Sequence, residues 1–90
     1  MSHTIKDKTR LLARVRRLKG QIAAIEAALE AEAPCADILN LTASVRGAVS
    51  GLTIELIEGH LLEHVVAAAD DASRADGAEE LIEVMRTYLK

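Results

Sequence analysis

The stretch CADILNLTASVRGAVSGLTIELIEGHLLEHVVAA, residues 35–68, decides the fold. Apolar residues recur along it at every third or fourth position, which is the period of one face of an α-helix. They are Ile38, Leu41, Val45, Val49, Leu52 and Leu56. The pattern predicts one helix over about 35–68, roughly 45 Å long at the α-helical rise. A compact globule of this chain length has a radius of gyration of only about 12 Å, so we expect the helix to extend beyond a single compact core.

Toward the N-terminus, a second run of apolar residues has the alternating 3–4 spacing of a helix that packs along another helix. Its members are Leu11, Val15, Leu18, Ile22, Ile25 and Leu29. The spacing predicts a helix over about 5–31, with Thr4 or Asp7 as the capping residue. Pro34 cannot continue this helix but is accepted in the first turn of the next, so Cys35 should lie at or near the start of the long helix.

Toward the C-terminus, the polar stretch 70–77 is typical of a loop. Asp76 is positioned to cap a last helix over 77–89, with Glu79 and Glu80 near its positive end. An apolar face is expected at Ala78, Leu81, Ile82, Met85 and Leu89. No segment alternates as a strand does, so we predict an all-α protein of three helices in a single domain, residues 1–90.

Two long helices and one short helix leave apolar surface along most of their length. A chain of 90 residues buries only a modest fraction of its surface by itself. We therefore expect subunits to pair antiparallel into a helical bundle. The N-terminal ten residues lack the apolar stretch of a signal peptide, and no apolar run is long enough to span a bilayer. These features favour a soluble cytoplasmic protein without a membrane partner.

The net charge of −3 hides a strong asymmetry. Residues 1–20 contain seven Lys or Arg and one Asp, and the rest of the chain contains four Lys or Arg and thirteen Asp or Glu. Seven basic residues form the predicted stripe: Lys6, Arg10, Arg14, Arg16, Arg17 and Lys19 on the first helix, with Arg46 as a candidate from the second. A solvated face usually mixes signs, so this stripe favours double-stranded DNA as a partner. The scarcity of aromatic residues disfavours single-stranded nucleic acid.

The side chains best suited to a metal ion are His3, Cys35, His60 and His64. His60 and His64 are four residues apart on one helix and share a face, although such a pair is also common without a metal. Cys35 and His60 would lie about 37 Å apart on the same helix. An antiparallel dimer would instead place Cys35 of one subunit beside His60 and His64 of the other. The alternative interpretation is that Cys35 is a small buried apolar residue, which is common for a free cysteine.

Catalysis has little support in the sequence. The chain has no Gly-rich phosphate loop. A histidine from a neighbouring subunit could act as a base for the thiol of Cys35, but nothing in the sequence supplies an orienting group or a substrate pocket. We therefore expect a protein that is not an enzyme.

Five motifs together resemble the CsoR/RcnR family of bacterial repressors, and most of all its nickel- and cobalt-sensing RcnR and DmeR branch. They are the opening Met-Ser-His-Thr-Ile, Arg-Val-Arg-Arg-Leu-Lys-Gly-Gln at 14–21, Val-Arg-Gly-Ala-Val at 45–49, Gly-His-Leu-Leu-Glu-His at 59–64 and the closing Tyr-Leu-Lys, with Cys35 between them. The resemblance covers essentially the whole chain. It implies a three-helix protomer, an antiparallel dimer and a tetramer made of two dimers.

The resemblance also implies a repressor that leaves operator DNA when an intersubunit site binds Ni(II) or Co(II), which derepresses efflux genes. The implied ligands are the amine of Ser2, His3, Cys35, His60 and His64, and Glu63 is a further candidate for cobalt. The DNA-binding positions implied by the family are Arg14 and Arg17, with Arg46 as an addition. Three nitrogen ligands and one thiolate suit nickel, cobalt or zinc, so Zn(II) stays a third candidate.

Two alternatives remain open at this point. The family's formaldehyde sensors use an N-terminal proline with Cys35 and carry Glu at the position of His64, whereas this chain has Ser2 and His64. A formaldehyde sensor using Cys35 and the N-terminal amine is therefore the alternative function. A helical assembly module that binds neither metal nor aldehyde is the other. Copper sensors fit less well, because they carry a second cysteine at the position of His64 and Cu(I) prefers sulfur.

Overall fold

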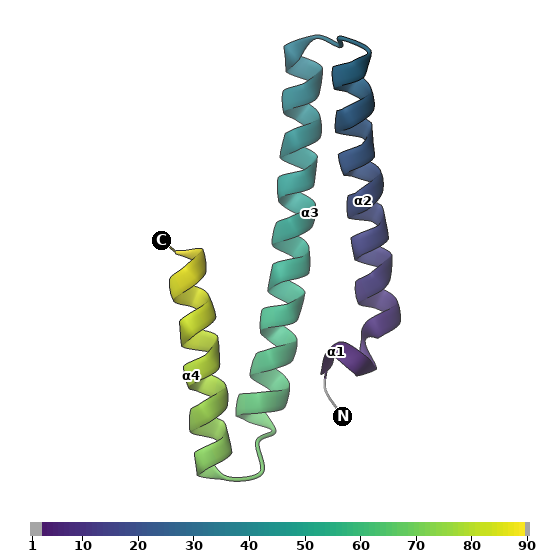
Figure 1. Ribbon diagram of the computed structural model, residues 1–90. Helices are drawn as coiled ribbons and strands as arrows, with labels where there is room; N and C mark the ends of the chain where they lie inside the picture. The colour runs from purple at the N-terminus through teal and green to yellow at the C-terminus, as the bar shows by residue number, and fades with distance from the viewer. Residues whose placement is uncertain (1–2, 90) are drawn as a thin grey trace. The chain divides into compact units, whose positions relative to one another are not determined.

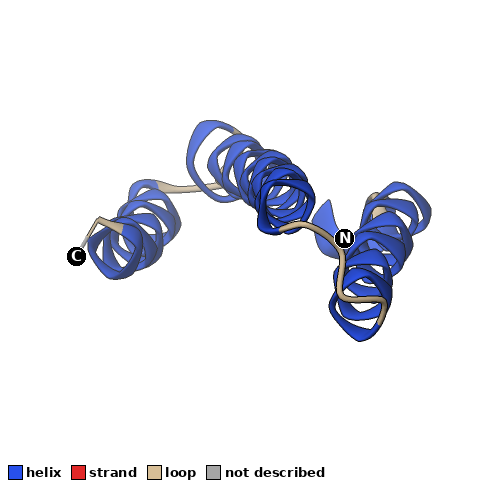
Figure 2. Ribbon diagram, turned by 90° about the horizontal axis from the view of Figure 1, so that it is seen from above, coloured by secondary structure: helices blue, strands red, loops and turns tan. Residues whose placement is uncertain are grey.

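The computed structural model describes residues 3–89, and every regular element in that range is helical. Figure 2 shows helices joined by short loops, without a strand among the described residues. The prediction of an all-α protein is therefore confirmed. The chain divides into two compact units, one made of residues 8–53 and the other of the described residues 3–7 and 54–89.

The unit of residues 8–53 is a helical hairpin (Figure 1). Helix α2 (Lys8–Glu30) runs antiparallel to the first part of helix α3 (Cys35–Leu61). The half-buried positions recur every three or four residues on both helices, as expected where two helices face each other. They include Leu11, Val15, Leu18 and Ile25 on α2, and Ile38, Leu41, Val45 and Leu52 on α3.

The predicted helix over 5–31 differs from the structure at its start. The four-residue helix α1 (His3–Lys6) precedes α2, and the two are separated by a turn at Asp7. The amide of Asp7 still donates to the carbonyl of His3 at 2.9 Å, so the chain turns there with little loss of helical hydrogen bonding. Thr4 lies inside α1, whereas Asp7 directly precedes the first residue of α2, the position of a capping residue. Helix α1 belongs to the unit of residues 3–7 and 54–89, and α2 belongs to the unit of residues 8–53.

The connection between α2 and α3 ends the first helix before Pro34 is reached. The amides of Glu32 and Ala33 donate back to the carbonyls of Leu29 and Ala28 at 3.1 and 2.9 Å. This pair of bonds is a Schellman motif, which places one residue in the left-handed region. That residue is Glu32, with φ of 56°. The carbonyl of Pro34 then accepts the first amide bonds of α3, so Cys35 is the first residue of that helix, as predicted.

In the unit of residues 3–7 and 54–89, the long helix ends earlier than predicted. The α-helix stops at Leu61 and continues as a π-helical turn, η1 (Leu62–Val66), rather than running to about residue 68. The guanidinium of Arg74 donates to the carbonyls of Val65 and Ala68 at 3.0 and 3.3 Å. These bonds give partners to carbonyls at the end of the helical segment, where intrahelical donors are lacking.

The last helix also begins earlier than predicted. Helix α4 (Asp71–Tyr88) includes most of the stretch 70–77 that composition assigned to a loop. Asp70 is the N-cap, with Oδ1 accepting from the amide of Ser73 at 2.7 Å, so the assignment of Asp76 as the cap is wrong. Arg74 and Asp71 form an ion pair one turn into the helix at 2.7 Å. Polar residues with local partners therefore start this helix.

Large apolar side chains remain exposed on every helix and on η1. The set contains Ile5, Leu12, Ile22, Leu29, Leu39, Val49, Ile54, Leu61, Leu62, Val66, Ile82, Val84, Met85, Tyr88 and Leu89. Exposed apolar surface in this amount is typical of a chain that has a protein–protein interface. Within the described part of the chain, none of the helices combines the length and apolar character needed to cross a membrane.

The left-handed backbone of Glu32 generates the first prediction. A Glu32→Gly substitution should raise the free energy of unfolding by about 0.5–1 kcal/mol, because glycine adopts positive φ without the steric cost carried by other residues. Urea unfolding at a fixed protein concentration measures the effect. Glu30→Gly, inside the end of α2, is the matched control and should lower stability instead. Equal effects of the two substitutions would contradict the explanation.

The cap of α4 generates a prediction about pH. Hydrogen bonds from the backbone and side chain of Ser73 lower the pKa of Asp70 below its ordinary value of 3.8. The charged cap therefore stabilises α4 above that ordinary value, and its contribution is lost as the pH falls through the lowered pKa. Asp70→Ala should lower the unfolding midpoint at neutral pH, and the difference from the unsubstituted protein should shrink on acidification. A difference that is constant from pH 7 down to pH 2 would exclude this role.

Candidate metal centre

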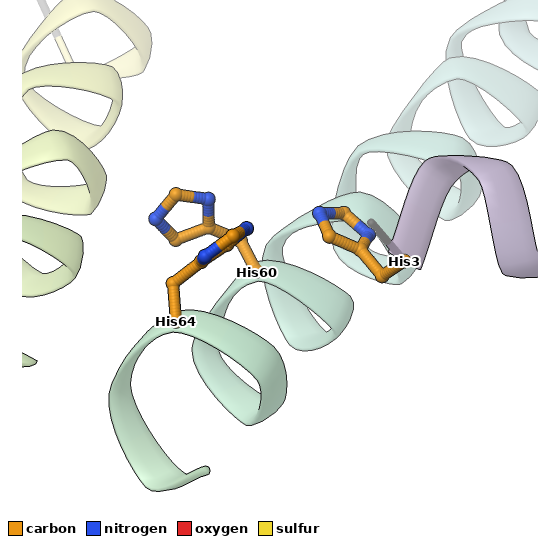
Figure 3. A group of neighbouring side chains, drawn as sticks. All are labelled: His3, His60 and His64. Carbon is orange, nitrogen blue, oxygen red and sulfur yellow. The ribbon is translucent and has the colours of Figure 1, made fainter. Parts of the chain in front are cut away.

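Three histidines from three segments converge in the unit of residues 3–7 and 54–89. His3 comes from α1, His60 from the last turn of α3 and His64 from η1. One nitrogen from each ring can be chosen so that all three lie within 4.8 Å of one another. Figure 3 shows His60 and His64 projecting from neighbouring turns, with the ring of His3 reaching toward them from α1. All three side chains are half-buried.

The spacing of the imidazoles fits a shared metal ion. The ring centroids of His60 and His64 are 4.7 Å apart, and the ring of His3 is 5.9 Å from His64 and 6.3 Å from His60. Metal–nitrogen bonds of about 2.0–2.1 Å require ligand nitrogens roughly 2.8–3.4 Å apart in cis octahedral or tetrahedral geometry. Small ring rotations would bring nitrogens from within 4.8 Å to that separation. Imidazole nitrogen is a good ligand for nickel, cobalt, zinc and copper.

Helix α4 orients the ring of His60. The Nε2 atom of His60 lies 2.9 Å from the carbonyl oxygen of Gly77. A carbonyl only accepts, so Nε2 must carry the proton and donate, which leaves Nδ1 of the neutral ring as the ligand atom. A carboxylate oxygen of Glu80 lies 3.7 Å from the same Nε2. Gly77 and Glu80 therefore select both the tautomer and the orientation that a metal ligand needs.

Gly77 also lies where α4 approaches the backbone of η1 closely. It is the single residue classed as buried in the described range 3–89. A side chain at this position would collide with the carbonyl group of His64 and lie 2.9 Å from its Cβ atom. The obstacle is backbone, which cannot move aside cheaply. The missing side chain at Gly77 thus allows one backbone segment to contact two of the three histidines.

The remaining predicted ligands have different positions. The carboxylate of Glu63 accepts a hydrogen bond from the backbone amide of His3, so it holds the N-terminal segment against η1. Cys35 is exposed at the start of α3, in the unit of residues 8–53. It is not part of the histidine cluster. Ser2 lies outside the described residues, so the predicted role of its amine stays a prediction.

The predicted DNA-binding residues are all exposed. Lys6 lies on α1, Arg46 lies on α3, and the other five lie on α2. The guanidinium of Arg14 extends from α2 over Gly51 of α3, where an added side chain would come within 3.0 Å of its Nη1. Gly51 therefore leaves room for a basic group between the two helices of the hairpin.

Sequence reasoning did not identify Gly77 and Glu80 as parts of the site. Glu80 was expected only as an acidic residue near a helix start, and Gly77 as the boundary of a loop. The acid-rich turn before Leu81 contained a weak signal, because a carboxylate often supports a ligating imidazole. Nothing in the sequence indicates which glycine carbonyl faces a histidine.

Comparisons with known proteins identify the class. Residues 7–87 match the profile of the metal-sensitive transcriptional repressor family. The chain belongs to this family, and the resemblance to CsoR/RcnR repressors is confirmed. The protein is thus one of the metal-sensitive repressors of transcription.

Individual relatives align over the full length. The chain is 50% identical over 91 residues to an uncharacterised protein of Serratia marcescens, with all of both chains covered. It is 43% identical over 90 residues to the transcriptional repressor RcnR of Citrobacter koseri, again with both chains fully covered. Among solved structures, it resembles a Glu-to-His variant of the formaldehyde-responsive regulator FrmR from Salmonella enterica serovar Typhimurium. That match has a TM-score of 0.84 and 44% identity, and covers 92% of this chain and 94% of the other.

The contact of α4 with the histidines generates the third prediction. Gly77→Ala should lower the free energy of unfolding of the metal-free protein by about 1–3 kcal/mol, because the added methyl group meets backbone atoms. It should also release Nε2 of His60 from its carbonyl partner, which two-bond ¹H–¹⁵N imidazole spectra detect as a mixture of tautomers.

Gly20→Ala is the matched control for this prediction. An added methyl group at Gly20 meets nothing within 4 Å, so the substitution should leave stability unchanged or raise it by about 0.4–1 kcal/mol. A Gly77→Ala protein as stable as the control, with the same His60 tautomer as the unsubstituted protein, would refute the role given to Gly77.

Proposed function

We propose that this protein is a nickel- or cobalt-responsive repressor that binds operator DNA in its metal-free state and leaves it on metal binding. The observation that carries the proposal is the convergence of three imidazole nitrogens within 4.8 Å of one another. Relatives named RcnR, aligned over the whole chain, add support. Zn(II) is the third candidate effector, because the same donors also suit zinc. The role is regulatory, with no catalytic step.

The proposed ligand set extends beyond the histidine cluster. His60 and His64 would hold the ion from the end of α3 and η1, and His3 would contribute a third nitrogen from α1. Cys35 of a second subunit and the amine of Ser2 would complete the set, with Glu63 as a further candidate. A thiolate at the first residue of α3 is favoured by the partial positive charge of the helix N-terminus.

An oligomer is part of the proposal. Exposed apolar residues such as Leu39, Val49 and Ile54 on α3 would be covered if two subunits paired antiparallel. This pairing would place Cys35 of one α3 beside the end of the other. Two such dimers would form the proposed tetramer, and the single 1–90 chain would be its repeating domain.

The DNA contact is proposed for the exposed basic side chains. Arg14 and Arg17 on α2 would contact phosphates, and Lys6, Arg10, Arg16, Lys19 and Arg46 would extend the positive surface. Phosphate neutralisation by several Lys and Arg residues makes affinity strongly dependent on salt concentration. The operator belongs to bacterial DNA, so the cytoplasm is the proposed location.

Coupling between the two sites follows from the segments that hold the ligands. His3 would tie α1, which precedes α2 in the chain, to the end of α3. Cys35 would tie the start of α3 to a neighbouring subunit. Both ties would favour one arrangement of the subunits. In that arrangement the basic surfaces would no longer match the spacing of the phosphates, so the protein would release DNA. The coupling is reciprocal, so DNA must weaken metal binding by the same factor.

A formaldehyde sensor is the second candidate, favoured by the structural likeness to the FrmR variant. In that case the thiol of Cys35 and the N-terminal amine would be joined through a methylene group. The thiol and amine would each give up one hydrogen, and formaldehyde would lose its oxygen as water. The presence of His64, which completes a nitrogen-rich cluster, favours the metal over the aldehyde.

Titration of protein and operator DNA with nickel or cobalt tests the proposal. Saturating metal should release the DNA, as measured by fluorescence anisotropy with protein that has a native N-terminus. His64→Ala should weaken metal affinity roughly tenfold or more, because it removes a ligand side chain. It should leave DNA affinity without metal unchanged. DNA binding that is unaltered at saturating nickel, cobalt and zinc would rule out a metal sensor.

The same assay with formaldehyde separates the second candidate. Release of DNA together with a mass increase of about 12 Da, from a methylene bridge, would favour aldehyde sensing. We expect metal-dependent release and no such bridge at formaldehyde concentrations that leave other proteins unmodified.

A further inference from the structure

The backbone of Gly59 lies directly against the ring of His3. A methyl carbon at Gly59 would be 2.5 Å from Nδ1 of His3, 3.1 Å from its Cγ and 3.3 Å from its Cε1. Carbon contacts are normally 3.5–4.0 Å, so any side chain at this position would overlap the imidazole. All three nearest atoms belong to one ring. Gly59 therefore forms the floor of the place that His3 occupies.

Glycine has no conformational reason to be at this position. Gly59 lies inside α3 and has ordinary helical backbone, since no glycine in the described residues has positive φ. Alanine would be favoured there by about 1 kcal/mol on helix propensity alone. Gly59 thus lowers the stability of α3, and in return it leaves space for the ring of His3.

Gly59 and Gly77 differ in the atoms that an added side chain would meet. At Gly77 the obstacle is the backbone of His64, whereas at Gly59 it is the end of a movable side chain on a short N-terminal helix. A side chain at Gly59 would be accommodated by displacement of His3. His60 and His64 would keep their own contacts with α4. The expected result is a folded protein whose cluster has two imidazoles in place of three.

We propose that Gly59 is a specificity-determining positioning residue, which decides whether the N-terminal segment can contribute the His3 nitrogen to the metal site. The inference rests on the proposed metal-sensing function. Figure 3 shows the ring of His3 directed from α1 over the end of α3 toward His60 and His64. The bond from the His3 amide to Glu63 fixes the backbone of this residue. Glu63 thus fixes the backbone of His3, and the lack of a side chain at Gly59 leaves space for its ring.

The role predicts a change in metal preference. A third neutral nitrogen favours ions that take several nitrogen ligands, such as nickel and cobalt. Loss of that nitrogen should weaken cobalt affinity roughly tenfold to a hundredfold, the usual effect of losing support for a ligand. The substitution should act only through His3, so it should have little effect in a protein that lacks this side chain.

A double-mutant cycle with Co(II) tests the inference. Gly59→Ala, His3→Ala and the double variant are titrated with cobalt in competition with a chelator, and the visible absorption of the bound ion is recorded. We expect Gly59→Ala to reproduce the weaker affinity and altered spectrum of His3→Ala. In the His3→Ala background, Gly59→Ala should change affinity less than about twofold. Additive losses, or an unchanged spectrum in Gly59→Ala, would overturn the inference.

A metal-free measurement distinguishes this inference from the proposed function. The NMR signals of the His3 ring in apo-protein should shift in Gly59→Ala and stay unchanged in the control Gly20→Ala, where an added methyl group meets nothing within 4 Å. Circular dichroism should show an unchanged helix content in both variants. Failure of the unsubstituted protein to bind cobalt, nickel and zinc would overturn the metal-sensing function. An unmoved His3 ring in Gly59→Ala would overturn the role of Gly59 whatever the protein senses.

Discussion

Close backbone approach at two glycines is the constraint on which the histidine cluster depends. Three imidazoles from separate segments share one small volume only if the segments come nearer than ordinary side chains permit. Gly77 brings α4 against the backbone of His64, and Gly59 leaves space for the ring of His3 on α3. A methyl group is the smallest side chain, and it is already too large at both positions. The geometry of the cluster therefore depends on the lack of a side chain at both positions.

Helix α4 acts as a support for the cluster. Its carbonyl at Gly77 and the carboxylate of Glu80 both face Nε2 of His60. One turn earlier, Arg74 donates to the carbonyl of Val65 in η1 and to that of Ala68 just after it. The same helix thus sets the tautomer of one histidine and holds the end of the segment that carries another. A ligand ring supported in this way loses little freedom when it binds an ion.

The two long helices could be predicted because apolar residues at every third or fourth position report a buried face directly. Pro34 likewise indicated the start of α3. The start of α4 was missed because Asp70, Ser73 and Arg74 resemble a loop in composition, while their hydrogen bonds to one another and to η1 make them a helix start. Local polar contacts of this kind override a judgement based on polarity alone.

The site was predictable to a similar degree. The four-residue spacing of His60 and His64 indicated a shared face, and His3 joined them as a candidate because of its residue type. The supporting contacts of Gly59 and Gly77 had no signal, since the need for a missing side chain becomes visible only once its neighbour is located. The partner of Cys35 depends on a second subunit, which no pattern within one chain can place.

The π-helical turn at Leu62–Val66 has a consequence for the histidine pair. A π turn holds one residue more than the α-helical turn it replaces, and such turns are commonly kept where they serve a site. Deletion of Leu62, which lies between His60 and His64, would leave every histidine present. It would also rotate His64 by about 100° relative to His60. A change in the length of this segment would therefore separate the pair without altering either histidine, so the number of residues in the turn matters as much as the identity of the ligands.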